Sequence, residues 1–328
     1  MSSKNTTKTT SGGAPSAAEE NAAKYPDMSL GQRVHRLEDP VALLKEIAGI
    51  ENVHLYRYVL SKLKDKKVDV PTTNVLSEAD LQSLINKHKE RLVEMEQDVK
   101  TAAENAGDME VLEARLAIAR YAAQCLDPTE AIAAYRKVLD LPKLSSGKQM
   151  DAWMEMARIA FFYKLQGTTT SPDHYIAQAE KLSERGGGDW DRRNRLKVYR
   201  SLAKLWQRDM AGAAPLLLDG MATFSCNELC TYSDFLIYAM LANLLHLDRP
   251  VVHEKILQGP EVMAVQHEIP IVVSLCCSEI GVYMDLESYN LDLVCSEYCS
   301  HTMFIFILLS VCAYYRIMLS DQIGQIVV

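Results

Sequence analysis

The clearest periodicity in the chain is a stripe of apolar positions over residues 77–107. Steps of four and three residues separate its members, which are Leu81, Ile85, His88, Leu92, Met95, Val99, Ala102 and Ala106. Such a heptad pattern lays one apolar seam along a long helix. Ser77 opens the helix in the stretch "SEAD", where its hydroxyl can accept free backbone N–H groups, and Gly107 ends it. We interpret His88 as a packed histidine and not as a ligand.

Shorter helical segments precede and follow this stripe. Residues 28–66 carry apolar positions at helical spacing, and Pro71 breaks the connector that follows. From residue 108 the helices come in pairs, whose first members begin near residues 109, 149, 190 and 227. The period, together with small residues such as Ala131 on the helix faces, is typical of tetratricopeptide-like or HEAT-like repeats. We therefore predict an all-α fold, a right-handed α-solenoid of tetratricopeptide-like helix pairs preceded by a long helix.

Composition supports a helical protein and disfavours one broad class. Only 15 Gly and 11 Pro occur among 328 residues, which favours helix. The net charge of −8 disfavours a general nucleic-acid binder, because such proteins need a cationic surface. Residues 1–27 are polar and lack the apolar core of a signal peptide, so we expect a disordered tail and an intracellular protein.

The stretch "GGGDWDRRNRLKVY", residues 186–199, interrupts the helical pattern. A phosphate-binding loop needs a preceding strand and a Gly-x-x-x-x-Gly-Lys pattern, and neither is present. We predict instead the joint between two helix pairs. At least one glycine takes a left-handed C-cap conformation, Asp189 caps the next helix, and Asp191 lies in its first turn. Trp190 is expected to be buried between the two pairs.

A basic run follows the joint, with eight Arg or Lys and three Asp over residues 185–209. Arg192 and Arg195 share one side of the predicted helix, whereas Arg193 and Lys197 share the neighbouring side. Three interpretations stay open. The run is a solvated face, a docking stripe for an acidic protein, or a nucleic-acid surface, and the lack of interleaved aromatic side chains disfavours the last. The docking hypothesis takes all four of these side chains as partner-binding residues.

The same stretch carries a family resemblance. "GGDWDRRNRLKVY" and, in order, "LLLDGMATFSCNEL" and "LDRPVVHEKILQGPEVMAV" resemble the proteasome lid family of non-ATPase regulatory subunit 6, over about residues 25–271. The family assigns catalysis to none of the motif positions, which are Gly187, Gly188, Asp189, Trp190, Asp191, Arg192, Arg193, Asn194, Arg195, Leu196 and Lys197.

The resemblance implies a non-catalytic scaffold subunit of the 26S proteasome regulatory-particle lid, acting in ubiquitin-dependent protein degradation. Its implied partners are other lid subunits and the ATPase ring, and its implied location is the cytoplasm and nucleus. It also implies a winged-helix PCI module after the helical arm. We expect no cofactor, metal, nucleic acid, membrane or small-molecule substrate. The alternatives are a stand-alone helical-repeat adaptor and the related signalosome subunit.

The residues themselves indicate no catalytic site. No Ser–His–Asp or Cys–His set stands out among eight scattered histidines. Ser225 and Glu228 in "SCNE" are expected to form a capping box that opens the next helix. Cys226 and Cys230 have the spacing of one helical turn, but no second pair is nearby, so we interpret them as ordinary helix cysteines.

The composition shifts near residue 272, and the tail that follows resembles neither a winged helix nor the family's closing helix. We hypothesise that this tail is a translated intron, because the codons GTA-AGT for Val273–Ser274 would match the usual start of an intron. Its stretch "MFIFILLSVCAYY" is too short to span a bilayer. A chain with this tail in place of the PCI module is expected to fold its arm but to stay outside the lid.

We therefore divide the chain into four segments. A disordered tail (1–27) precedes the N-terminal helices with the heptad helix (28–107). A helical-repeat domain of the proteasome-lid type (108–271) follows, and the atypical tail (272–328) ends the chain.

Overall fold

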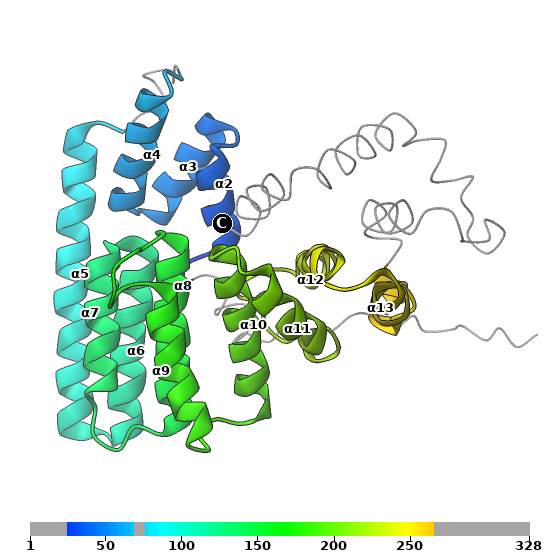
Figure 1. Ribbon diagram of the computed structural model, residues 1–328. Coiled ribbons are helices and arrows are strands. Elements are labelled where there is room, and N and C mark those ends of the chain that lie inside the picture. The colour runs from blue at the N-terminus through cyan, green and yellow to red at the C-terminus, as the bar shows by residue number, and fades with distance from the viewer. Residues whose placement is uncertain (1–24, 69–75, 266–328) are drawn as a thin grey trace, which may run out of the picture.

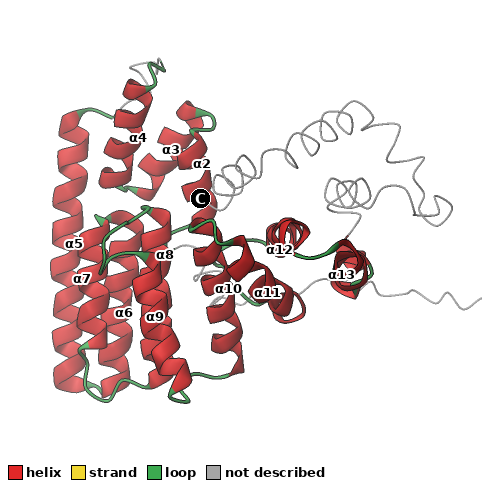
Figure 2. Cartoon of the chain, viewed as in Figure 1, coloured by secondary structure: helices red, strands yellow, loops and turns green. Residues whose placement is uncertain are grey.

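The computed structural model describes residues 25–68 and 76–265, and within these ranges every regular element is a helix (Figure 1, Figure 2). The prediction of an all-α fold is confirmed. No helix in these ranges is both long and apolar enough to cross a bilayer. The predictions for residues 1–24 and for the tail at 272–328, its intron origin included, lie outside the described residues.

The helices follow the expected order. Helices α2 (Met28–Arg36), α3 (Pro40–Ile50) and α4 (Val53–Asp65) lead to the long helix α5 (Glu78–Asn105). Four pairs follow: α6 (Asp108–Cys125) with α7 (Pro128–Leu139), α8 (Ser146–Phe162) with α9 (Pro172–Glu184), α10 (Trp190–Trp206) with α11 (Met210–Gly220), and α12 (Tyr232–His246) with α13 (Arg249–Val252). Three short turns of helix complete the described chain: η2 (Met221–Thr223), η3 (His253–Leu257) and α14 (Pro260–Val265). The starts of the pairs confirm the predicted repeat period.

The helix α5 is opened by the predicted cap. Ser77 Oγ accepts the Asp80 N–H at 3.2 Å, and Asp80 Oδ2 accepts the Ser77 N–H at 3.0 Å. The helix lies at the edge of the array and packs on α6 (Figure 1). Of the heptad seam, Leu81, His88 and Val99 are buried, and the other members are half-buried or exposed. An edge helix has neighbours on one side only, so its seam is only partly covered.

Small side chains allow close packing between the helices of the repeats. Ala119 and Ala122 on α6 and Ala131 on α7 are buried, as is Ala157 on α8. Tyr135, predicted to share the packed face of α7, is completely buried. Close approach of two helices needs such residues at the contact, because larger side chains would hold the axes apart.

Polar contacts fasten the N-terminal helices, which have an apolar core of their own, to the repeats. Asn52 Nδ2 donates to the Gln124 carbonyl at 2.9 Å and to the Tyr163 hydroxyl at 3.1 Å. Arg158 of α8 is 1% exposed, and its Nε donates to the Tyr25 carbonyl at 3.0 Å. The residue at the start of the described chain is therefore held by a buried arginine of the second helix pair.

Candidate protein-interaction site

The turn between α9 and α10 requires glycine. Gly186 and Gly188 have φ angles of +82° and +75°, in the left-handed region that other residues rarely adopt. The Gly187 N–H donates to the Leu182 carbonyl at 2.9 Å, and the Gly186 N–H donates to the Ser183 carbonyl at 3.0 Å. These two bonds are those of a Schellman motif, so the predicted C-cap is confirmed.

Asp189 caps α10, as predicted. Its Oδ1 accepts the Arg192 N–H at 3.0 Å. Asp191 lies in the first turn, where its negative charge interacts favourably with the helix dipole. Asn194, one turn further, is 5% exposed. The buried face of α10 therefore begins a full turn after its first residue.

Trp190 is 68% exposed, so the prediction that it is buried between the pairs is wrong. Side chains of a helix tilt toward its N-terminus. At the first residue of α10 this tilt carries the indole away from the buried face, which starts at Asn194. Arg192 fills the space beside α8 instead. A Cβ atom added to Gly147 would lie 3.3 Å from Arg192 Cζ, so glycine leaves room for the guanidinium there.

Arg192 binds two carboxylates of its own chain. Its Nε and Nη2 donate to the two oxygens of Asp151 on α8, both at 2.8 Å, and its Nη1 donates to Asp189 at 2.7 Å. Hydrogen bonding to Asp151 raises the pKa of Arg192. Bidentate arginine–carboxylate pairs are among the stronger hydrogen-bonded pairs in proteins. Arg192 thus fixes α10 to α8.

Arg195 joins α10 to the segment before α12. Its Nε and Nη2 donate to Glu228 Oε1 at 2.9 and 2.5 Å. The two side chains are 20% and 5% exposed. Burial lowers the pKa of Arg195, but the charge of Glu228 outweighs it and the net shift is upward. Arg195 therefore keeps its charge, and Glu228 has a buried structural role.

This role explains why the predicted capping box at Ser225 is wrong. Glu228 bonds to Arg195, and α12 begins only at Tyr232, where Thr231 Oγ1 accepts the Asp234 N–H at 3.1 Å. The free thiols Cys226 and Cys230 are buried in the turn before α12, not on a helix. In the described part of the chain, no cluster of three or more His, Cys, Asp or Glu side chains is placed to hold a metal.

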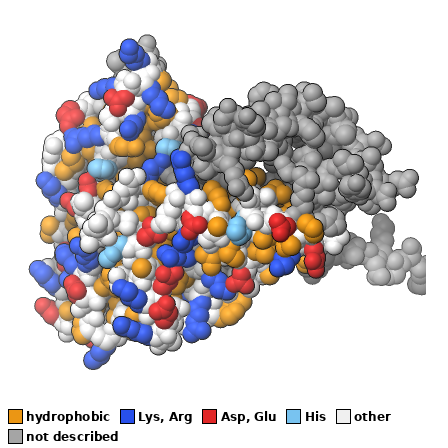
Figure 3. Space-filling view, in the orientation of Figure 1, with side chains coloured by type: hydrophobic (Ala, Val, Ile, Leu, Met, Phe, Trp, Pro, Cys, Tyr) orange, Lys and Arg blue, Asp and Glu red, His pale blue; other side chains and the backbone are white. Residues whose placement is uncertain are grey.

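The remaining basic side chains of the run are more exposed. Lys197 Nζ donates to Asp219 on α11 at 2.6 Å, and these side chains are 41% and 63% exposed. Arg193 is exposed and forms no ion pair with any described residue. On the face drawn in Figure 3, Lys and Arg side chains are interspersed with Asp and Glu. Three of the four proposed partner-binding residues thus have carboxylate partners within the chain, and docking of a partner stays a prediction.

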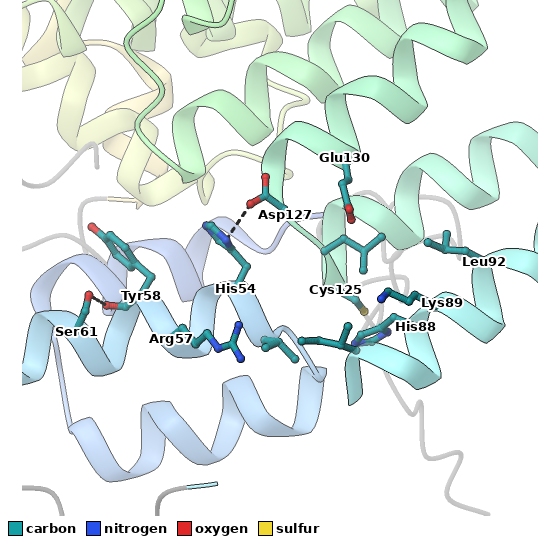
Figure 4. Close-up of a pocket in the computed structure, with 13 residues that line it drawn as sticks. His54, Arg57, Tyr58, Ser61, His88, Lys89, Leu92, Cys125, Asp127 and Glu130 are labelled. Carbon is teal, nitrogen blue, oxygen red and sulfur yellow. Dashed lines mark hydrogen bonds and ion pairs between the residues drawn. The ribbon is translucent and has the colours of Figure 1, made fainter. Parts of the chain in front are cut away.

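A cleft of about 500 Å³ lies between α4, α5 and the turn from α6 to α7 (Figure 4). His54 Nδ1 pairs with Asp127 at 3.0 Å across its rim. Cys125 and His88 both line it, which raises the question of a nucleophilic pair. Burial raises the pKa of Cys125 to about 11, so the thiol is protonated at neutral pH. A protonated thiol is a poor nucleophile.

His88 is engaged on both ring nitrogens. Nδ1 lies 2.7 Å from the Tyr121 hydroxyl and Nε2 lies 2.8 Å from the Glu51 carbonyl oxygen. The ring is 3% exposed. The interpretation of His88 as a packed histidine is confirmed, and the cleft offers neither an activated thiol nor a free imidazole nitrogen from these two residues.

The fold and the joint define an all-α helical-repeat protein, in which ion pairs link successive helix pairs. Comparison with known proteins identifies the family. The model of the family "26S proteasome subunit RPN7" matches residues 77–255. The chain belongs to this family.

Individual relatives belong to the same family. The chain is 30% identical over 255 residues to the 26S proteasome non-ATPase regulatory subunit 6 homolog of Arabidopsis thaliana, covering 76% of this chain and 63% of the relative. It is 30% identical over 251 residues to the 26S proteasome regulatory subunit rpn7 of Schizosaccharomyces pombe, and the match covers 75% of this chain and 62% of that relative. It is 27% identical over 292 residues to the 26S proteasome regulatory subunit RPN7 of Saccharomyces cerevisiae, and that match covers 83% of this chain and 66% of the relative. The matched region thus spans somewhat less than two thirds of the first two relatives.

Proposed function

We propose that the chain is a non-catalytic scaffold subunit of the 26S proteasome lid, which supports ubiquitin-dependent degradation through protein–protein contacts. The observation that carries this proposal is the family match over residues 77–255, which spans α5 and the helix pairs. The protonated Cys125 and the fully bonded His88 agree with a structural role for the cleft.

The proposal also covers the binding partners of the chain, its location in the cell and the roles of its two helical segments. The arm, taken as residues 108–271, contacts other lid subunits and the ATPase ring in the cytoplasm and nucleus. Residues 28–107 brace the arm through α5 and the N-terminal core. No partner other than protein is included, because the surface drawn in Figure 3 mixes both signs of charge and the chain carries a net charge of −8.

Co-purification tests this function. The tagged full-length chain is expressed in eukaryotic cells depleted of their own RPN7-family subunit, and tagged complexes are resolved on native gels and analysed by mass spectrometry. We expect the chain to migrate with the 26S proteasome and to recover lid subunits. A chain that purifies alone refutes the proposal and favours the adaptor, and recovery of signalosome subunits favours that alternative. Purification alone refutes lid assembly of this chain whether or not the tail at 272–328 is a translated intron.

A further inference from the structure

The exposed side of α10 carries three side chains that contribute little to the packing of the fold. Trp190, Arg193 and Lys197 are spaced by three and four residues, so they lie along one side of the helix. We name them the α10 stripe. Trp190 is 68% exposed, and Arg193 is exposed without an ion pair to any described residue. Neither side chain is explained by packing or by charge pairing within the described chain.

Lys197, the third member, has a partner that it can exchange. Its pair with Asp219 is 41% and 63% exposed on the two sides. Exposed pairs of this kind contribute little to stability. A carboxylate on another protein can therefore replace Asp219 at little cost. The pairs of Arg192 and Arg195 on the neighbouring side are less exposed and are not exchanged in this way, because breaking them would leave a partly or fully buried carboxylate without its partner.

The composition of the α10 stripe is that of an interaction surface. Trp and Arg are enriched among the residues that dominate binding energy at protein interfaces. We propose that the α10 stripe docks an acidic segment of another protein that also carries an apolar side chain. The apolar side chain packs on the Trp190 indole, and carboxylates pair with Arg193 and Lys197. The inference rests on one part of the proposed scaffold function, namely that the chain binds other proteins.

The charges around the α10 stripe favour a protein over a nucleic acid. Asp191 is exposed beside Trp190, and Asp219 lies beside Lys197. These carboxylates would repel a continuous line of phosphates. Trp190 is also the only aromatic member of the stripe, whereas single-strand binding uses successive stacking side chains. An acidic peptide, whose charges are discrete and can be spaced, avoids both difficulties.

Peptide binding to the isolated full-length chain tests the inference. The probe is a short synthetic peptide of alternating Glu and Leu, and its two controls replace Glu by Gln or Leu by Gly. Binding is followed by the NMR signal of each tryptophan indole N–H. We expect the Trp190 signal to move with the Glu–Leu peptide, and those of Trp153 and Trp206, which pack on the repeat core, to stay in place. Both control peptides are expected to bind at least about tenfold more weakly.

Variants assign the effect to the α10 stripe. Binding of the variants is measured by isothermal titration calorimetry, because Trp190→Ala removes the indole that reports binding. Trp190→Ala and Arg193→Glu should each weaken binding at least about tenfold. The matched controls are Met109→Ala, an exposed apolar residue on α6, and Lys89→Glu, an exposed lysine on α5. They should bind like wild type, and circular dichroism should show equal helix content throughout. Unmoved Trp190 signals, equal binding of the Gln–Leu peptide, tighter binding of oligothymidine or unaffected stripe variants would overturn the inference. Because the assay uses no proteasome, its failure is separate from failure of co-purification.

Discussion

The buried pair between Arg195 and Glu228 gives a sharp test of what holds successive helix pairs together. Arg195→Met keeps most of the volume of the side chain but leaves the Glu228 carboxylate, whose side chain is 5% exposed, without its cation. Breaking a buried pair from one side costs about 3–5 kcal/mol. At about 2–4 °C per kcal/mol for a domain of this size, the melting temperature should fall by roughly 6–20 °C.

The control lies on the same helix. Lys197→Met breaks the exposed pair with Asp219 and should cost no more than about 1 kcal/mol. The double variant Arg195→Met with Glu228→Gln removes the unpaired charge and should recover part of the loss. The free energy of unfolding is measured in urea by circular dichroism, and wild type, Arg195→Met, Glu228→Gln and the double variant form a double-mutant cycle. Equal small losses for the Arg195 and Lys197 variants, or no recovery in the double variant, would refute the role given to burial.

Three further predictions follow from the joint and the cleft. Gly188→Ala should lower the stability of the chain in thermal melts by about 1–3 kcal/mol, because the φ angle of Gly188 is +75° and an added Cβ would lie 2.6 Å from Met150 Sδ. Gly49 has open space around it, so the control Gly49→Ala should be neutral or stabilising in the same melts. Trp190→Ala should change the free energy of unfolding by less than about 0.5 kcal/mol, as for other exposed positions, and a larger loss in urea titrations would mean that the indole is packed. The Cys125 thiol, whose pKa burial raises from 9.0 to about 11, should react with iodoacetamide at pH 8 about a hundredfold more slowly in the native chain than in urea, as read by peptide mass spectrometry. Its protonated form stabilises the fold fully below pH 9, and that contribution should be lost as the pH rises toward 11.

Local signals in the sequence predicted much of the fold. The Ser77 cap, the glycine turn at 186–188 and the Asp189 cap depend on a few adjacent residues, and each is found where expected. The repeat period was also readable, because each helix pair must bury one apolar face.

Features that depend on distant residues could not be read in the same way. Glu228 is part of a plausible capping box, and only the approach of Arg195 from α10 shows that it serves elsewhere. Trp190 has the size of a core residue, but its position at the first residue of a helix decides its exposure. The basic run looked like one stripe, whereas Asp151 on α8 takes Arg192 out of it.

The ion pairs of the joint have a consequence for how the array comes apart. Repeat arrays can unravel from one end when each unit contacts only its neighbours weakly. Here Asp151 on α8 binds Arg192 on α10, and Arg195 on the same helix binds Glu228 ahead of α12. One line of charges therefore crosses three successive pairs, and losing the last pair leaves the Arg195 guanidinium of the middle pair without the Glu228 carboxylate that had neutralised it. Unfolding of the last helix pair alone therefore costs additional free energy, so the repeats should unfold together in one cooperative transition.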